Sequence, residues 1–244
     1  CMTAQLLTAC TITSPCATWE CGLEQARRHT VGQSKRLLLN RGDTFTVTSD
    51  PTRWSNEIDD TWVTGYGSGA RPIVQRAGPR LFEVAENSGI PSGNIRFSEI
   101  DFISVSNGLV AGMQFVGNKN LFLRSTLTDS GSGESMFLND NTALPTSANN
   151  DWIFYDSTVT STNPNSSYVI YGLASQTLSL HPSRVAFIGA RVLRQGLYTA
   201  GSDPIRIYPG KGFLFAYGTI KADDSGSSNV LRVAVNNGAN VLNN

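Results

Sequence analysis

An all-β solenoid is the fold class that the sequence predicts. Three observations lead to it: few charged residues, short strand patterns with alternating apolar side chains, and a template that recurs along the chain. Only 16% of the 244 residues are charged, while Gly, Ser, Thr and Asn are abundant. This balance favours strands and turns over helices and excludes an all-helical fold.

Charge and hydropathy exclude two kinds of partner. The 19 basic and 19 acidic side chains give a formal net charge of zero. Nucleic acids bind proteins through concentrated positive charge, so we expect no nucleic-acid partner, and any polyanion would have to bind locally. No apolar run approaches the roughly 18 residues of a membrane span, so we expect none.

The N-terminal segment holds all the cysteines. They are Cys1, Cys10, Cys16 and Cys21. Their spacing matches no zinc-ligand pattern. Two interpretations stay open: disulfides in an oxidising compartment, or a bacterial lipoprotein cleavage box at Leu7–Cys10, with Cys10 lipidated. Because the apolar stretch before Cys10 is short for a signal peptide, we assign residues 1–21 only to a leader or N-terminal extension.

A short helix is expected where the folded part begins. Leu23, Ala26 and Arg27 follow Gly22 at helical spacing, and Gly32 is a nearby stop signal. After this helix, residues 36–47 combine a short apolar strand, a Gly–Asp turn and an alternating strand. From here on the pattern predicts strands and turns.

A template recurs five times between residues 94 and 220. Its copies begin at Asn94, Asn120, Asp151, Arg184 and Gly212. Four copies carry apolar or small residues at offsets 1, 3, 6 and 8, whereas the copy at Asn120 keeps only Leu121 and Leu123. Successive copies begin 26 to 33 residues apart, which is typical of the stacked rungs of a solenoid.

A second short strand precedes most copies of the template. These strands are Met113–Phe115, Leu178–Leu180, Ile205–Ile207 and Leu231–Val233. Alternation sends two side chains of each strand inward and one outward. Three such strands per turn make a parallel β-helix, whereas the strands of a β-sandwich seldom recur with one template. We therefore predict a single parallel β-helix domain over residues 22–244.

These segments resemble the right-handed parallel β-helices of the pectate-lyase type. Leu23–Ala26 and Leu37–Phe45 resemble the N-terminal capping helix and first rung of that superfamily, and Tyr66–Ile73 is similar to the next rung in many secreted bacterial members. The resemblance implies a right-handed β-helix that is secreted or at the cell surface. Members commonly have more rungs, and Ala239–Asn244 ends inside one, so we expect a truncated chain or an end that another subunit caps.

The resemblance also implies a polysaccharide-acting protein, a lyase or glycoside hydrolase that binds an extended acidic glycan along one face. The outward positions of the second strand predict a ladder of Gln114, Ser179, Arg206 and Arg232. In such lyases a basic residue abstracts the proton beside a sugar carboxylate, and cations neutralise that carboxylate. The catalytic candidates are Arg206, Lys211 and Arg232. The substrate-binding candidates are Gln114, Ser179, Asp203 and Tyr217.

Two features weaken the catalytic interpretation. Many secreted relatives carry a Glu-His pair and, on the following rung, a His-Asn pair where this chain has Asp203–Pro204 and Tyr217–Gly218, so both imidazoles are missing here. Calcium, the cofactor implied by the resemblance, needs several converging carboxylates, and the candidates Asp223 and Asp224 also fit an ordinary polar loop. Alternatively, Asp203, Asp223 or Asp224 would only neutralise the arginines in surface ion pairs.

The outward positions of the first strand are mostly apolar. We expect them to be Arg96, Phe122, Ile153, Ala186 and Leu214. Because a solvated face is not normally apolar, we expect a loop such as Asn139–Asn150 or a second chain to cover it. The alternative function is therefore a non-catalytic module for adhesion, glycan binding or assembly, with a homo-oligomer formed through this face. Trp54, Trp62, Tyr168 and Tyr171 are candidates for stacking on sugar rings.

Overall fold

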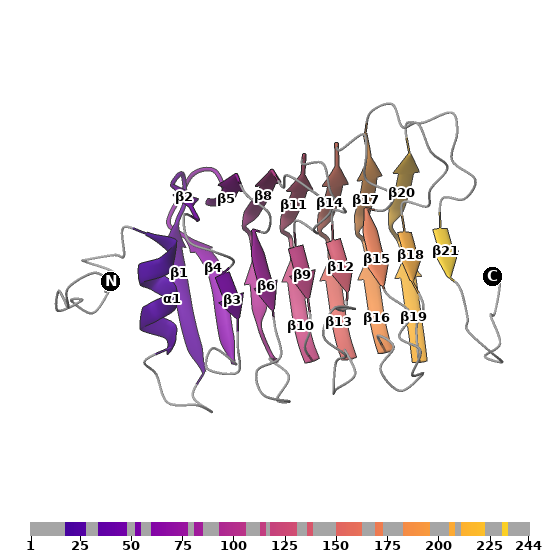
Figure 1. Ribbon diagram of the computed structural model, residues 1–244, viewed down its shortest axis with the longest axis horizontal. Coiled ribbons are helices and arrows are strands. Elements are labelled where there is room, and N and C mark those ends of the chain that lie inside the picture. The colour runs from indigo at the N-terminus through magenta and orange to yellow at the C-terminus, as the bar shows by residue number, and fades with distance from the viewer. Residues whose placement is uncertain are drawn as a thin grey trace.

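The elements form one elongated solenoid in which strands of successive turns lie side by side (Figure 1). The computed structural model describes residues 18–27, 34–47, 52–54, 60–77, 81–84, 93–105, 113–115, 118–130, 136–138, 150–162, 169–172, 183–195, 205–207, 211–222 and 231–233. A single helix, α1 (Trp19–Arg27), lies at the N-terminal end of these described residues.

The described strands form three parallel sheets of seven strands each. Sheet A contains β1 (Lys35–Asn40), β4 (Thr61–Tyr66), β7 (Arg96–Ser98), β10 (Asn118–Leu123), β13 (Asn150–Tyr155), β16 (Ser183–Ile188) and β19 (Lys211–Ala216). Sheet B contains β2 (Thr44–Thr46), β5 (Ile73–Ala77), β8 (Asp101–Val105), β11 (Thr126–Asp129), β14 (Thr158–Ser161), β17 (Arg191–Arg194) and β20 (Thr219–Ala222). Sheet C contains β3 (Thr52–Trp54), β6 (Phe82–Val84), β9 (Met113–Phe115), β12 (Met136–Leu138), β15 (Ile170–Gly172), β18 (Ile205–Ile207) and β21 (Leu231–Val233). Each turn adds one strand to each sheet, which confirms the predicted parallel β-helix.

The predicted N-terminal helix is also confirmed. Trp19, Leu23 and Ala26 of α1 are buried in the same hydrophobic cluster as the strand residues. The helix approaches β1 closely at Gly22, where a Cβ atom would come within 2.8 Å of Leu37 Cδ1. It begins at Trp19, three residues before the domain start that we set at residue 22.

A stack of aromatic rings runs along the inner face of sheet A. The rings of Phe97, Phe122, Phe154 and Phe187 are fully buried, with centroids 5.0, 5.2 and 4.7 Å apart along the stack. The predicted outward position of Phe122 is therefore wrong. The register instead places Leu121 between Arg96 and Ile153 on the outer face.

Left-handed residues turn the chain at both ends of the sheet A strands and mark the equivalent positions of successive turns. One column lies at the N-terminal ends of the strands, with φ of 56°, 58°, 61° and 55° at Asn94, Lys119, Asp151 and Arg184. The other follows them, with φ of 57°, 45°, 46°, 62° and 55° at Glu99, Arg124, Asp156, Gly189 and Tyr217. A left-handed residue bends the backbone within one position, so short corners can join two sheets. Lys119, and not Asn120, is thus the equivalent of Asn94, and the sequence template was aligned one residue late there.

Candidate functional site

The predicted ladder of sheet C is present in part. Its central register positions, in spatial order, are Arg53, Glu83, Gln114, Phe137, Tyr171, Arg206 and Arg232. Gln114, Arg206 and Arg232 therefore share one column, and the two arginines lie on adjacent rungs. β15 takes the rung that we expected for Leu178–Leu180, so Tyr171 and not Ser179 precedes Arg206.

The other predicted site residues are not all brought together. Lys211 begins β19 and pairs with Ser183 in sheet A, whereas Arg206 and Arg232 belong to sheet C. Tyr217 lies at the corner between sheets A and B, 97% exposed. Ser179, Asp203, Asp223 and Asp224 lie outside the described residues.

A pocket of about 400 Å³, here called the basic pocket, lies against the outer face of sheet A in its first turns. Its lining residues are Ser34, Lys35, Arg36, Asp60, Thr61, Trp62, Asn94 and Arg96. Arg36, Trp62 and Arg96 are directly opposite one another in register on β1, β4 and β7. Two guanidinium groups at outward positions, those of Arg36 and Arg96, line it against the single carboxylate of Asp60, so the pocket favours an anion.

Trp62 is held from two sides. The guanidinium carbon of Arg36 lies 5.0 Å from the centroid of its indole ring, which is cation–π geometry. On the other side, Trp62 Nε1 donates a hydrogen bond of 2.8 Å to Ser98 Oγ. The Ser98 hydroxyl donates in turn to Thr64 Oγ1 at 2.7 Å. The ring and the guanidinium on it are therefore positioned before any ligand arrives.

Arg96 is positioned by Asn94, one of the residues with left-handed backbone conformation. Its Nη2 donates a hydrogen bond of 3.0 Å to Asn94 Oδ1, and Asn94 Nδ2 donates to the carboxylate of Asp60. Since Asn94 uses both ends of its amide, it links the guanidinium to the carboxylate and keeps the two charges apart. Arg96 keeps further donors for a ligand because a guanidinium has five N–H groups.

A smaller cavity of about 70 Å³ adjoins the basic pocket at Trp62 and Arg96. Its other lining residues are Phe97, Ser98, Leu121 and Leu123. Charged donors and an apolar floor thus lie next to each other, which suits a ligand with both an anionic group and apolar C–H surface.

Arg36 and Arg96 were not among the predicted site residues, and Trp62 was named only as a stacking candidate. The signal that joins them is their shared place on three successive rungs, but the recurring template reached back only to residue 94. The missing step was therefore the alignment of the first two turns with the later ones.

The described residues contain no group of three or more His, Cys, Asp or Glu side chains that would hold a metal ion. Within the same residues, no helix has the length and apolarity that a membrane crossing requires. In comparisons with known proteins, no family model matches the chain, and neither a curated protein nor a solved structure matches it.

Proposed function

We propose that the protein binds an acidic polysaccharide outside the cytoplasm, with the basic pocket holding one of its anionic sugars. The observation that carries this proposal is that Arg36 and Arg96 flank Trp62 in register and line the same pocket. A guanidinium matches a carboxylate or sulfate with paired hydrogen bonds. An indole offers apolar surface to the C–H groups of a sugar ring.

The side chains that line the basic pocket are already held in place in the free protein, which favours binding. The contacts of Trp62 with Arg36 and Ser98, and of Arg96 with Asn94, order these side chains in the free protein. Ordering a flexible side chain on binding costs roughly 0.5–1.5 kcal/mol, and part of that cost is already met here. A local site of this kind also agrees with a chain whose net charge is zero.

Binding is tested by calorimetric titration with a panel of acidic and neutral polysaccharides. We expect binding to acidic members only, and about tenfold or greater loss in Arg36→Ala and Arg96→Ala. Arg191→Ala is the matched control, because Arg191 is an exposed arginine on sheet B. Equal binding by all three variants, or equal binding of neutral chains, would contradict the proposal.

We also propose that the protein cleaves the glycan it binds, with the catalytic residues on sheet C. Arg206 and Arg232 lie on adjacent rungs, about 4.8 Å apart along the axis, where like charges favour an anionic ligand between them. Lyase activity produces unsaturated uronates, which absorb ultraviolet light. We propose to measure this absorbance with and without calcium for the wild type and Arg206→Ala; no signal from folded wild-type protein excludes lyase activity on the polysaccharides tested.

A second candidate function is assembly, which one specific observation favours. The outer face of sheet A is apolar over its last four strands, with Ile153, Tyr155 and Leu214 exposed by 37%, 47% and 49%. Exposed apolar patches mark interaction sites in soluble proteins. We propose that this face forms a homo-oligomer, and light scattering across a concentration series gives the test; a monomer at all concentrations would exclude it.

A further inference from the structure

The apolar area on sheet A, here called the apolar patch, consists of two parallel ladders. One ladder contains Leu121, Ile153, Ala186 and Leu214. The other contains Leu123, Tyr155, Ile188 and Ala216. Both ladders run without a polar interruption from β10 to β19, in contrast to the Arg36, Trp62 and Arg96 positions on the earlier rungs.

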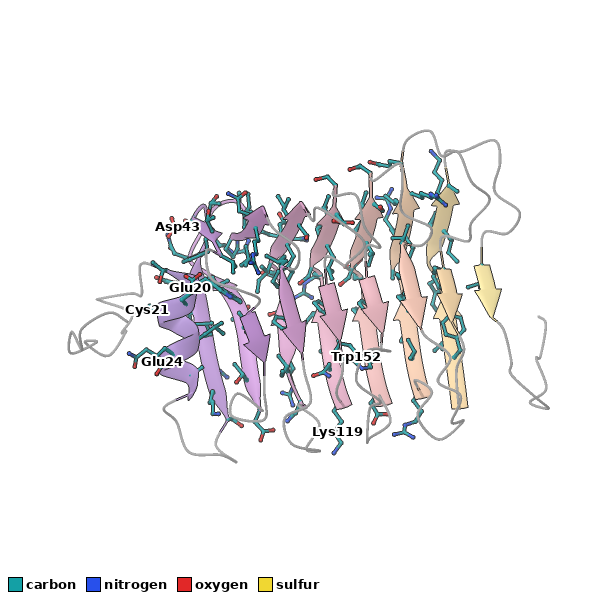
Figure 2. The ribbon with its side chains drawn as sticks, in the orientation of Figure 1. Glu20, Cys21, Glu24, Asp43, Lys119 and Trp152 are labelled. Atoms are coloured by element: carbon teal, nitrogen blue, oxygen red, sulfur yellow. The ribbon has the colours of Figure 1, made fainter. Side chains whose placement is uncertain are left out.

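Corner residues, six of the eight with polar side chains, border both sides of the apolar patch. Lys119, Asp151, Arg184 and Gly212 form the column at the N-terminal ends of the strands, and Lys119 projects from the start of β10 in Figure 2. Arg124, Asp156, Gly189 and Tyr217 form the column after them. An apolar centre with a polar rim is the usual anatomy of a protein interface.

We propose that two copies of the chain pack face to face through the apolar patch, about a two-fold axis that runs along the strands midway between β13 and β16. The proposal rests on the assembly role proposed above and adds the symmetry and register. This axis places β13 opposite β16 of the second copy, and β10 opposite its β19. Each residue of the patch then faces a residue of the patch.

Two of the four facing apolar pairs place a large side chain opposite a small one. Ile153 faces Ala186 of the second copy, and Leu123 faces its Ala216. Leu121 faces Leu214, and Tyr155 faces Ile188. A large side chain opposite a small one lets two sheets interdigitate, as sheet packing requires.

Two of the four facing rim pairs are complementary under the same axis, and the other two set Lys119 and Asp156 opposite glycines. Asp151 faces Arg184 of the second copy, and the symmetry repeats this contact. Within one chain Arg184 already donates to Asp151, with Nε–Oδ1 of 2.5 Å and Nη2–Oδ2 of 3.0 Å, so the four charges meet as two opposite pairs. Arg124 faces Tyr217, whose ring is almost fully exposed and available for a cation–π contact.

Other two-fold arrangements bring unfavourable groups together. An axis through β13 itself sets Asp151 against its own copy and Lys119 against Arg184. An axis along the solenoid exchanges the two rims, so Asp151 faces Asp156 and Lys119 faces Arg124. An axis between β10 and β13 sets Arg96 against Ala186. Opposed like charges and desolvated charges disfavour each of these alternatives.

Cysteine cross-linking tests the register. We expect a mixture of Leu121→Cys and Leu214→Cys proteins to form a 121–214 disulfide under mild oxidation, identified by peptide mapping. Either variant alone does not cross-link at its new cysteine, because two copies of position 121 lie three rungs apart, about 14 Å. Wild-type protein oxidised in parallel accounts for the native cysteines.

A second variant separates self-association from glycan binding. Ile153→Arg is expected to raise the dimer dissociation constant about 30-fold or more, as loss of a central interface residue does. Ile153 lines neither cavity, so the variant should match the wild type in glycan affinity when both are monomeric. The comparison is made below the dimer dissociation constant, because Leu121 and Leu123 belong to both the smaller cavity and the apolar patch. Ile103→Arg is the matched control, because Ile103 lies on the outer face of sheet B and should leave the dimer intact.

Three outcomes would overturn the proposal. They are a wild-type monomer at every concentration, a dimer cross-linked at 121–121 or 214–214, and a dimer that Ile153→Arg does not weaken. A monomeric wild type would exclude the dimer but not glycan binding, which the calorimetric titration measures independently. Failure of one proposal can therefore be told apart from failure of the other.

Discussion

The guanidinium of Arg36 lies over the indole ring of Trp62, with 5.0 Å between the guanidinium carbon and the ring centroid. The two residues are 26 positions apart in sequence and directly opposite each other in register. Because the same indole donates to Ser98 on the next rung, one aromatic side chain links three turns of the solenoid. We therefore expect substitution of Trp62 to affect both the stability of the first turns and the proposed binding at the basic pocket.

Trp62→Phe is expected to retain glycan binding better than Trp62→Ala. Phenylalanine keeps an aromatic face for the Arg36 guanidinium but loses the hydrogen bond to Ser98, whereas alanine loses both. We expect Trp62→Ala to weaken binding at least tenfold, with Trp62→Phe intermediate, in calorimetric titrations. Equal losses in the two variants would show that the aromatic ring itself contributes nothing.

The Asp151–Arg184 pair makes stability depend on pH at the acid end. Hydrogen bonds from Arg184, aided by its charge, lower the pKa of Asp151 below its usual value of 3.8. A lowered carboxyl pKa stabilises the fold above the unfolded-state pKa, and this contribution is lost as the pH falls through the folded-state pKa.

Arg184→Gln is therefore expected to return the pKa of Asp151 toward its usual value. The carboxyl resonance in an NMR titration reports this shift, and unfolding curves of the variant should lose less stability below about pH 4 than those of the wild type. Arg191→Gln, on sheet B, is the control. An unchanged titration of Asp151 in Arg184→Gln would contradict the assignment.

Gly189→Ala tests the left-handed corner between sheets A and B. The φ of Gly189 is 62°, yet a Cβ atom there would meet nothing closer than Asp156 Cα at 3.8 Å. Any cost therefore comes from backbone conformation and not from crowding. We expect a loss of about 1–2 kcal/mol in urea denaturation for alanine and a smaller loss for Gly189→Asn. Identical stabilities for alanine and asparagine would refute this account.

Phe154→Ala tests the aromatic stack. Phe154 is fully buried, with ring centroids 5.2 Å from Phe122 and 4.7 Å from Phe187. Removing a buried phenylalanine typically costs about 3–5 kcal/mol, and Phe154→Leu should cost much less because it leaves a smaller cavity. Tyr155→Ala on the outer face is the comparison. A Phe154→Ala loss no larger than that of Tyr155→Ala would show that the stack is not central to stability.

The two prediction errors within the repeats have one physical origin. The turns are joined by connections of different length, so equivalent positions cannot be found by counting along the chain. Phe122 was placed outward because the copy at Asn120 was aligned one residue late. Tyr171, expected only as a stacking candidate, was not placed in the ladder because residues 178–180 show the same alternation.

The pattern of residues along the chain is sufficient to predict the parallel β-helix, the N-terminal helix and the register column that Gln114, Arg206 and Arg232 share. Alternation along a strand depends only on neighbouring residues, so it can be recognised in the sequence without knowing which strands pair. The tertiary structure alone decided which rungs stack on each other. It therefore decided that Arg36, Trp62 and Arg96 line one pocket, because backbone hydrogen bonds between turns bring together residues that lie up to 60 positions apart.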